Sequence, residues 1–306
     1  MKIPRASEAA EYTTISTGLP QLDRITGIGG IPFKRITEIS GTWSVGKTTL
    51  ALQIVKSAQE QGVECIWFDA EWSWDDLYAR NVGVDVEKLG LLQKRVAEDA
   101  LDEVLNYLEG DKNRKPGKDT LIVIDAIGAL HPRDEAEKES GGRTIGAQAG
   151  LVARFCRKIV PMLALNNNAL LVLNHEYVDV MQTQPGRPAT IKTSGGRKLE
   201  YHKSLWIRLT RTGTNIKHGE FFVGFKIEAE IRKNKLAATQ KELCGMDLYY
   251  NKGFSPTSEL LQDALDKQVI TRTGNTFWLG KEKIGTIGKL REWIKSNGER
   301  VQELLK

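Results

Sequence analysis

Residues 36–62 read ITEISGTWSVGKTTLALQIVKSAQEQG, and this stretch decides the fold. A short apolar run at residues 36–39 is followed by the glycine-rich segment GTWSVGKT at residues 41–48. The next segment carries apolar residues at helical spacing until Gly62 ends it. A phosphate-binding loop requires this order, because its backbone N–H groups and the N-terminus of the helix then surround a phosphate. The sequence therefore predicts a nucleoside triphosphatase or a kinase.

Individual residues of this loop receive roles from the same pattern. The Lys47 ammonium is expected to reach the β- and γ-phosphates of ATP, and the Thr48 hydroxyl is expected to ligate Mg²⁺. The residues expected to bind the nucleotide are contiguous: Gly41, Thr42, Trp43, Ser44, Val45, Gly46, Lys47, Thr48 and Thr49.

Three further apolar runs, at residues 65–68, 121–124 and 170–173, have the character of buried parallel strands. Because they alternate with helical segments, they indicate an α/β fold with a parallel sheet. Asp125 follows the second run, where an acid can hold Mg²⁺ through water. His175 follows the third run, at the sheet edge where α/β proteins place ligands. A helix-capping or surface role for His175 stays open on this pattern alone.

The segment IWFDAEWSWDDLYAR at residues 66–80 mixes acids with aromatic residues. Its first residues belong to the strand after the phosphate-loop helix, so Glu71 should lie at the carboxyl end of that strand. A carboxylate there can orient and deprotonate a water molecule beside the γ-phosphate. Most kinases need no base for water, so Glu71 favours hydrolysis over phosphoryl transfer.

Composition bounds the class of protein. The 306 residues suffice for a large core domain and one small appendage, and the net charge is +5. Residues 187–241 hold thirteen Lys or Arg against four Glu, a local balance of +9, so the rest of the chain carries −4. This asymmetry indicates a polyanionic partner, although a solvated lysine-rich surface would give the same count. No run approaches the ~20 apolar residues of a membrane helix, and the three cysteines suggest neither disulfides nor a zinc site.

Several motifs together resemble the RecA-type homologous recombinases, including phage recombinases of the UvsX kind. They are ISTGLPQLDRITGIGGIPFKRITEISG, GKTTLALQ, FDAE, DDLYARNVGVD, LIVIDAIGAL, SGGRKLEYH and KNKLAA, in the family's order from about Tyr12 to the C-terminus. The resemblance implies a RecA-like ATPase core, with a central, mostly parallel sheet flanked by helices, at residues 12–253. It also implies a small α-rich C-terminal domain at residues 254–306. Residues 1–11 form a shorter N-terminal segment than the family usually has, which makes filament formation the least secure expectation.

The resemblance also implies roles for particular side chains. Glu71 would be the catalytic base, Tyr78 would stack on the adenine and Asp75 would make a polar contact with it. His175 would sense the γ-phosphate at a position where the family usually has glutamine. Paired lysines would act across a filament interface on the ATP of a neighbouring subunit, and they are Lys233 and Lys235. A solvated charge pair is the alternative for these lysines.

Two loops are expected to bind DNA by the same resemblance, at residues 135–146 and 176–196. Apolar side chains would wedge between bases, while arginines and glycine amides would contact phosphates. The residues concerned are Arg143, Ile145, Arg154, Arg157, Met181, Gly195, Gly196 and Arg197. Gly150 stands where the family usually has an arginine, and Arg154 is expected to supply that charge. Surface loops without function remain the alternative.

The sequence thus predicts an ATP-dependent DNA recombinase that forms filaments on single-stranded DNA. It would promote homologous pairing and strand exchange with a duplex, with ATP and Mg²⁺ as cofactors. A ring-forming helicase or regulatory ATPase of the same fold is the first alternative, and a DNA-binding mediator with little turnover is the second. The expected location is the cytoplasm, of a host cell if a phage encodes the chain.

Overall fold

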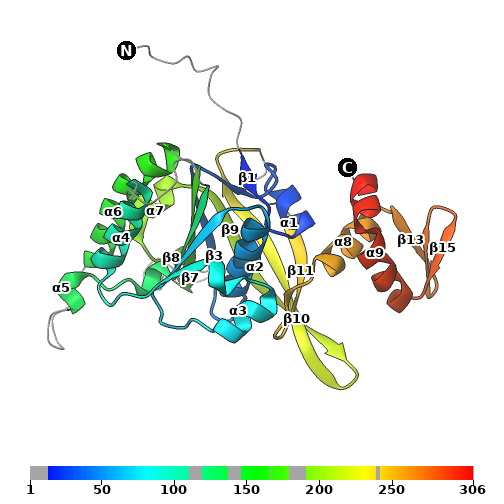
Figure 1. Ribbon diagram of the computed structural model, residues 1–306. Coiled ribbons are helices and arrows are strands. Elements are labelled where there is room, and N and C mark those ends of the chain that lie inside the picture. The colour runs from blue at the N-terminus through cyan, green and yellow to red at the C-terminus, as the bar shows by residue number, and fades with distance from the viewer. Residues whose placement is uncertain are drawn as a thin grey trace, which may run out of the picture.

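A ten-stranded sheet forms the centre of the molecule (Figure 1). The computed structural model describes residues 13–109, 119–136, 146–165, 167–178, 191–238 and 242–305. The strands of the sheet are β3 (Ile36–Gly41), β4 (Glu64–Asp69), β5 (Leu89–Leu92), β6 (Thr120–Asp125), β7 (Asn168–Val178), β8 (Ile191–Thr193), β9 (Lys203–His218), β10 (Phe221–Asn234), β11 (Leu243–Tyr249) and β12 (Gly253–Phe254). They lie in the order β12-β11-β10-β9-β3-β7-β6-β4-β5, and β8 pairs with β7 off this path.

The direction of the strands divides the sheet into two parts. The six strands β9, β3, β7, β6, β4 and β5 run parallel to one another. The strands β10, β11 and β12 extend the sheet antiparallel beyond β9, and β8 also pairs antiparallel with β7. The predicted α/β fold with a mostly parallel central sheet is confirmed.

Helices cover both faces of the parallel part, so its strands are apolar along both faces. The helix α2 (Lys47–Glu60) packs on one face, while α4 (Ala97–Glu109), α6 (Ala147–Leu165) and α7 (Gly196–His202) pack on the other. Along β6, Leu121 and Val123 belong to the core beneath α2. The alternate residues Ile122 and Ile124 belong to the second core. Because these strands run parallel, their carboxyl ends, with the polar residues that follow them, lie along one edge.

Short elements connect these layers. They are β1 (Thr14–Ile15), α1 (Pro20–Ile25), β2 (Ile31–Pro32), α3 (Asp76–Val82), α5 (Arg133–Ala136) and the 3₁₀ turns Val86–Lys88 and Ile127–Ala129. The helix α3 begins at Asp75, whose carboxylate accepts a hydrogen bond from Tyr78 N at 2.9 Å. It ends at Gly83, which adopts the left-handed conformation that favours glycine.

A third hydrophobic core lies in the C-terminal region. Its elements are α8 (Pro256–Asp266), β13 (Ile270–Thr273), β14 (Thr276–Leu279), β15 (Glu282–Gly285) and α9 (Ile287–Leu305). The sequence predicted a helical unit here, and the structure adds a three-stranded antiparallel sheet to its helices. The boundary near residue 254 stays a prediction. Within the part of the chain that the structure describes, no helix has both the length and the apolar character needed to cross a membrane.

Two features differ from the sequence prediction in ways that affect the site. The strand β7 continues to Val178, and β8 pairs with it, so both ends of the predicted loop 176–196 form a hairpin stem. The strands β9 and β10 form a long hairpin whose far end projects from the body at the lower edge of Figure 1.

Candidate functional site

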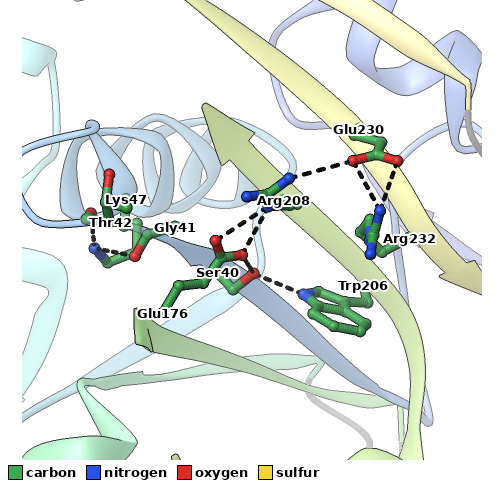
Figure 2. A network of polar contacts seen from close by, with 9 residues as sticks. All are labelled: Ser40, Gly41, Thr42, Lys47, Glu176, Trp206, Arg208, Glu230 and Arg232. Carbon is green, nitrogen blue, oxygen red and sulfur yellow. Dashed lines mark hydrogen bonds and ion pairs between the residues drawn. The ribbon is translucent and has the colours of Figure 1, made fainter. Parts of the chain in front are cut away.

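The phosphate loop joins β3 to α2 as predicted. Lys47 is the first residue of α2, and its Nζ donates to the carbonyl oxygens of Gly41 at 3.1 Å and of Thr42 at 2.7 Å (Figure 2). Gly46 has a φ of 91°, and a Cβ there would meet Leu248 Cδ1 at 2.6 Å. Glycine is therefore required to close the loop against β11.

A cavity of about 360 Å³ opens beside this loop. The residues that line it come from separate parts of the chain: Ser44, Val45, Gly46, Lys47, Thr48, Thr49, Glu71, Asp125, His175, Phe225 and Leu248. Burial lowers the pKa of Lys47, while the nearby carboxylates of Asp125 and Glu71 act in the opposite direction. The structure thus brings together the predicted phosphate ligand, metal ligands, base and sensor.

The predicted metal ligands lie in direct contact. The Thr48 hydroxyl donates to Asp125 Oδ2 at 3.0 Å. Burial raises the pKa of Asp125 to about 7, and the charge of Glu71 contributes in the same direction. A hydroxyl and a carboxylate are oxygen donors of the kind that Mg²⁺ prefers, so these residues fit that ion.

The predicted base and the predicted sensor are hydrogen-bonded to each other. His175 Nε2 and Glu71 Oε1 lie 2.8 Å apart. This hydrogen bond lowers the pKa of Glu71, and the partial burial of Glu71 opposes the shift. Glu71 is therefore held as a carboxylate, the form that a general base requires.

Asp69 shapes the turn that carries Glu71. Its carboxylate accepts hydrogen bonds from Ser73 N at 3.1 Å, Trp74 N at 2.9 Å and Gln93 Nε2 at 2.8 Å. The sequence analysis gave Asp69 no role. The signal that could have found this role is the acid two residues before the base, at the start of a tight turn.

The predicted adenine-binding residues lie at the start of α3, next to α2. The Asp75 carboxylate caps α3, and the Tyr78 hydroxyl shares a hydrogen bond of 2.7 Å with Thr49 Oγ1. Neither Asp75 nor Tyr78 is among the residues that line the 360 Å³ cavity. Their contact with adenine stays a prediction.

Comparison with known proteins agrees with this geometry. The sequence profile of the RecA N-terminal domain matches residues 1–255. The chain belongs to the RecA family. Protein RecA of Thermus aquaticus is 37% identical over 297 residues, which cover 96% of this chain and 84% of that protein. Protein RecA of Sulfurovum sp. (strain NBC37-1) is 36% identical over 278 residues, which cover 91% of this chain and 77% of that protein. Protein RecA of Aquifex pyrophilus is 36% identical over 283 residues, which cover 92% of this chain and 78% of that protein.

The predicted family is thereby confirmed, and membership places the chain among proteins of DNA recombination and repair. RecA family proteins are ATPases, and the cavity beside the phosphate loop is the candidate nucleotide site.

A chain of polar contacts joins β7, the strand that carries the predicted sensor His175, to its neighbours (Figure 2). The Glu176 carboxylate accepts from Ser40 Oγ at 2.8 Å and from Arg208 Nε at 3.0 Å, and its side chain is only 2% exposed. Trp206 Nε1 donates to Ser40 Oγ at 2.7 Å. Arg208 also lies 3.9 Å from Glu230 on β10. Glu176, predicted to belong to a DNA loop, instead lies in the β7–β8 stem with its side chain buried.

Two further contacts fix the end of the predicted second DNA loop. Asn174 Nδ2 donates to Ser194 O at 2.8 Å, and Ser194 N donates to Asn174 Oδ1 at 3.1 Å. Asn174, the residue next to His175, therefore holds the backbone just before Gly195. In addition, the Lys203 ammonium donates to Glu38 Oε2 at 3.0 Å, with both side chains buried.

The predicted DNA-binding residues divide into two groups. Arg143, Ile145 and Met181 lie outside the described residues. The others lie near the start of α7 and on the exposed side of α6: Gly195, Gly196, Arg197, Arg154 and Arg157. Gly195, Gly196 and Arg197 line a second cavity of about 570 Å³, and Arg154 lies 3.9 Å from Glu98. The high charge of residues 187–241 is only partly available to DNA, because Lys203 and Arg208 form internal ion pairs.

The paired lysines lie at the other end of α7. Lys233 donates to the carbonyl oxygen of Glu200, and Lys235 Nζ donates to Tyr201 O at 2.6 Å. Neither lysine lines the nucleotide cavity of its own chain. The structure thus leaves their predicted action on a neighbouring subunit as a prediction.

Proposed function

We propose that this chain is an ATP-dependent DNA recombinase. It assembles on single-stranded DNA as a helical filament and promotes pairing and strand exchange with a homologous duplex. The observation that carries the proposal is the hydrogen bond between Glu71 and His175 inside a cavity that also contains Lys47, Thr48 and Asp125. Membership in the RecA family supports the same conclusion.

In this proposal ATP binds with its phosphates on the backbone amides of residues 41–48 and on the Lys47 ammonium. Thr48 and Asp125 would hold Mg²⁺, and the bound ion would supply positive charge against the phosphates. Glu71 accepts a proton from the attacking water, whose oxygen forms a bond to the γ-phosphorus as the bond to the ADP oxygen breaks.

His175 is the contact through which the γ-phosphate acts on DNA binding. A phosphate oxygen competes with Glu71 for the His175 ring, which frees the base for water. The neighbouring Asn174 is hydrogen-bonded to Ser194, so a movement of β7 reaches Gly195 and Gly196. We assign the DNA phosphates to these glycine amides and to Arg197, with Arg154 and Arg157 on α6 beside them.

Lys233 and Lys235 complete the site of an adjacent subunit. They act on the γ-phosphate in trans, as an arginine finger does in related phosphoryl-transfer reactions. In the free chain their ammonium groups contact the last carbonyl groups of α7, so a neighbour's ATP must compete with those contacts.

A strand-exchange assay tests this function. The purified chain, ATP and Mg²⁺ are mixed with circular single-stranded DNA and a homologous linear duplex, and joint molecules are resolved on a gel. Joint molecules should form only with homologous duplex and should coincide with helical filaments in micrographs. Unwinding that is independent of homology, together with closed rings, would indicate a helicase. DNA binding without ATP turnover would indicate a mediator.

A further inference from the structure

A row of polar side chains crosses four neighbouring strands of the sheet. Asn174 of β7 pairs with Ser40 of β3. On its other side Ser40 pairs with Arg208 of β9, and Arg208 pairs with Glu230 of β10. Cross-strand partners share one face of a sheet, and Glu176, two residues after Asn174, belongs to the same face. The row therefore joins the strand of the predicted sensor to the antiparallel part of the sheet.

The Arg208 guanidinium contacts carboxylates from two of these strands (Figure 2). Its Nε donates to Glu176 Oε1 at 3.0 Å and to Glu176 Oε2 at 3.1 Å. Its Nη1 lies 3.9 Å from Glu230 Oε2. A planar guanidinium presents donors in several fixed directions, whereas a lysine ammonium is a compact point charge. Arg208 can therefore hold Glu176 while Glu230 fixes the orientation of the guanidinium.

The carboxylate that Arg208 holds is next to the predicted sensor in the chain. His175 and Glu176 are consecutive residues of β7, so their side chains point to opposite faces of the sheet. The His175 ring contacts Glu71, and Glu176 also accepts from Ser40 Oγ at 2.8 Å. The Ser40 hydroxyl in turn accepts from Trp206 Nε1 at 2.7 Å, which fixes its orientation. The backbone at His175 is thus anchored from the face opposite to its ring.

Stability alone does not account for this anchor. The Glu176 side chain is 2% exposed and the Arg208 side chain is 22% exposed. An ion pair this deeply placed adds little net stability, because the loss of hydration offsets most of the attraction. Charge-assisted hydrogen bonds are, however, directional, and apolar packing is not. The pair therefore specifies the position of β7 more than it stabilises the sheet.

We propose that Arg208 is a positioning residue for ATP hydrolysis. Through Glu176 it holds the backbone of β7 so that the His175 ring lies within reach of both Glu71 and the γ-phosphate. Glu230 keeps the guanidinium in the orientation that this requires. The inference rests on the proposed function, in which His175 contacts the γ-phosphate, and it adds residues from the opposite face of the sheet to that site.

Replacement of Arg208 by lysine tests the proposal in the full chain. R208K keeps a positive charge beside the buried Glu176, so the chain should fold, but one ammonium cannot reproduce the contacts of the guanidinium. We expect the DNA-stimulated kcat to fall by about tenfold or more, because a small displacement of a positioned group is costly in the reaction. The Kd of a fluorescent ATP analogue should stay at the wild-type value, since the phosphate loop is intact.

The His175 ring gives a second readout, which does not depend on turnover. Nitrogen–proton correlation spectra of the four histidine rings are recorded on the free chain. The signals of His175 are assigned by their loss in H175Q. In R208K these signals should shift toward those of an exposed imidazole, while those of His131 and His218 stay in place. A purely structural ion pair would leave the His175 signals where they are in the wild type.

The partners of Arg208 should respond as one unit. E176Q should reproduce the fall in kcat of R208K. The double variant E176Q/R208K should lose no more than either single variant, because both changes disrupt the same contact. E230Q leaves the contact between Glu176 and Arg208 in place and should give a smaller fall in the same direction.

An ion pair at a different place provides the matched control. Arg24 Nη2 lies 2.7 Å from Asp263 Oδ1, whose side chain is 9% exposed, and the pair joins α1 to α8. R24K makes the same substitution against a largely buried carboxylate outside the nucleotide cavity. It should leave kcat and the His175 ring signals unchanged. Equal losses of kcat in R24K and R208K would show general destabilisation and overturn the proposal.

Other outcomes also decide the matter. R208K with wild-type kcat and unchanged His175 signals would remove Arg208 from the reaction. Additive losses in E176Q/R208K would show that the two residues act separately. A wild-type chain whose ATPase activity does not respond to DNA would overturn the proposed function, whereas the His175 ring signals would still decide the role of Arg208. The two failures are therefore distinguishable.

Discussion

Glu71 Oε1 and His175 Nε2 lie 2.8 Å apart although 104 positions separate the two residues in the sequence. Glu71 follows β4 and His175 lies on β7, and β6 runs between these two strands in the sheet. The contact therefore crosses the carboxyl end of β6, where Asp125 lies. If His175 senses the γ-phosphate as proposed, a γ-phosphate oxygen that attracts His175 would release Glu71 from this hydrogen bond.

Replacement of His175 tests this relationship. A glutamine amide can donate to either Glu71 or a phosphate oxygen, so His175→Gln should retain DNA-stimulated ATPase activity within a few-fold. His175→Ala removes the donor, and the DNA-stimulated kcat should fall by about 10²-fold. Steady-state ATPase assays with and without single-stranded DNA measure both. Full DNA stimulation of the alanine variant would show that His175 does not couple DNA binding to ATP hydrolysis.

The roles of Lys47 and Glu71 should separate in binding and turnover. Lys47→Ala removes the cation from the phosphate loop and should abolish binding of a fluorescent ATP analogue. Glu71→Gln keeps the shape of the site but cannot accept a proton, so it should bind the analogue and lose at least about 10²-fold in kcat. A glutamine variant that hydrolyses ATP at the wild-type rate would exclude Glu71 as the base.

Local sequence predicted the parts of this site that depend on neighbouring residues. The phosphate loop, Asp125 and Glu71 each follow an apolar run, and a parallel strand brings its last residues to the ligand edge wherever it lies in the sheet. The motif order of the RecA family then supplied roles for His175 and the lysines. These inferences needed no knowledge of which strands are neighbours.

The remaining contacts depend on strand order and register, which local patterns do not encode. Lys203 and Arg208 were counted as surface charge, because nothing near them in the sequence reveals that β9 lies beside β3. That placement pairs Lys203 with Glu38 and brings Arg208 to Glu176. The stem of the second DNA loop was missed for the same reason, since the pairing of β7 with β8 spans residues 179–190.

A buried acid predicts a pH-dependent stability. Glu259 of α8 is 1% exposed, and its Oε1 accepts from Leu22 N at 3.0 Å, which joins the C-terminal region to α1. Burial raises the pKa of Glu259 to about 8 from an ordinary value near 4.5. Between these values the folded chain binds more protons than the unfolded chain. The contribution of Glu259 to the free energy of unfolding therefore falls as pH rises from 4.5 to 8.

Glu259→Gln should remove this dependence because the amide stays neutral. The variant should match the wild type in thermal unfolding near pH 5 and exceed it at pH 9, by a free energy on the order of 4 kcal/mol. Glu60→Gln, at an exposed position of α2, is the matched control and should show no such trend. A difference between the Glu259 variant and the wild type that does not change with pH would contradict a protonated Glu259.

Salt dependence tests whether Arg197 contacts DNA. If Arg197 neutralises one phosphate, Arg197→Ala should lower the slope of log affinity against log salt by about 0.7 for single-stranded DNA. Lys88→Ala removes an exposed cation on the far edge of the sheet and serves as the control. Fluorescence anisotropy at several salt concentrations gives both slopes. An unchanged slope and affinity for Arg197→Ala would remove that residue from the site.

The paired lysines give the sharpest test of assembly. Lys233 and Lys235 contact the last carbonyl groups of α7 and not the nucleotide cavity of their own chain. If they act on a neighbour's ATP, Lys233→Ala/Lys235→Ala should bind nucleotide normally and lose DNA-stimulated turnover. This double variant keeps Glu71, so a neighbouring subunit that supplies Lys233 and Lys235 should complete its site.

Glu71→Gln is that neighbour, because it lacks the base and keeps both lysines. In a mixed filament, ATP bound by the lysine variant can lie against the lysines of the Glu71 variant, which restores one complete site. Equal amounts of the two proteins should therefore show more DNA-dependent ATPase activity than the sum of each alone. If both bind ATP and assemble together on DNA while the mixture shows only that sum, the lysines do not act in trans.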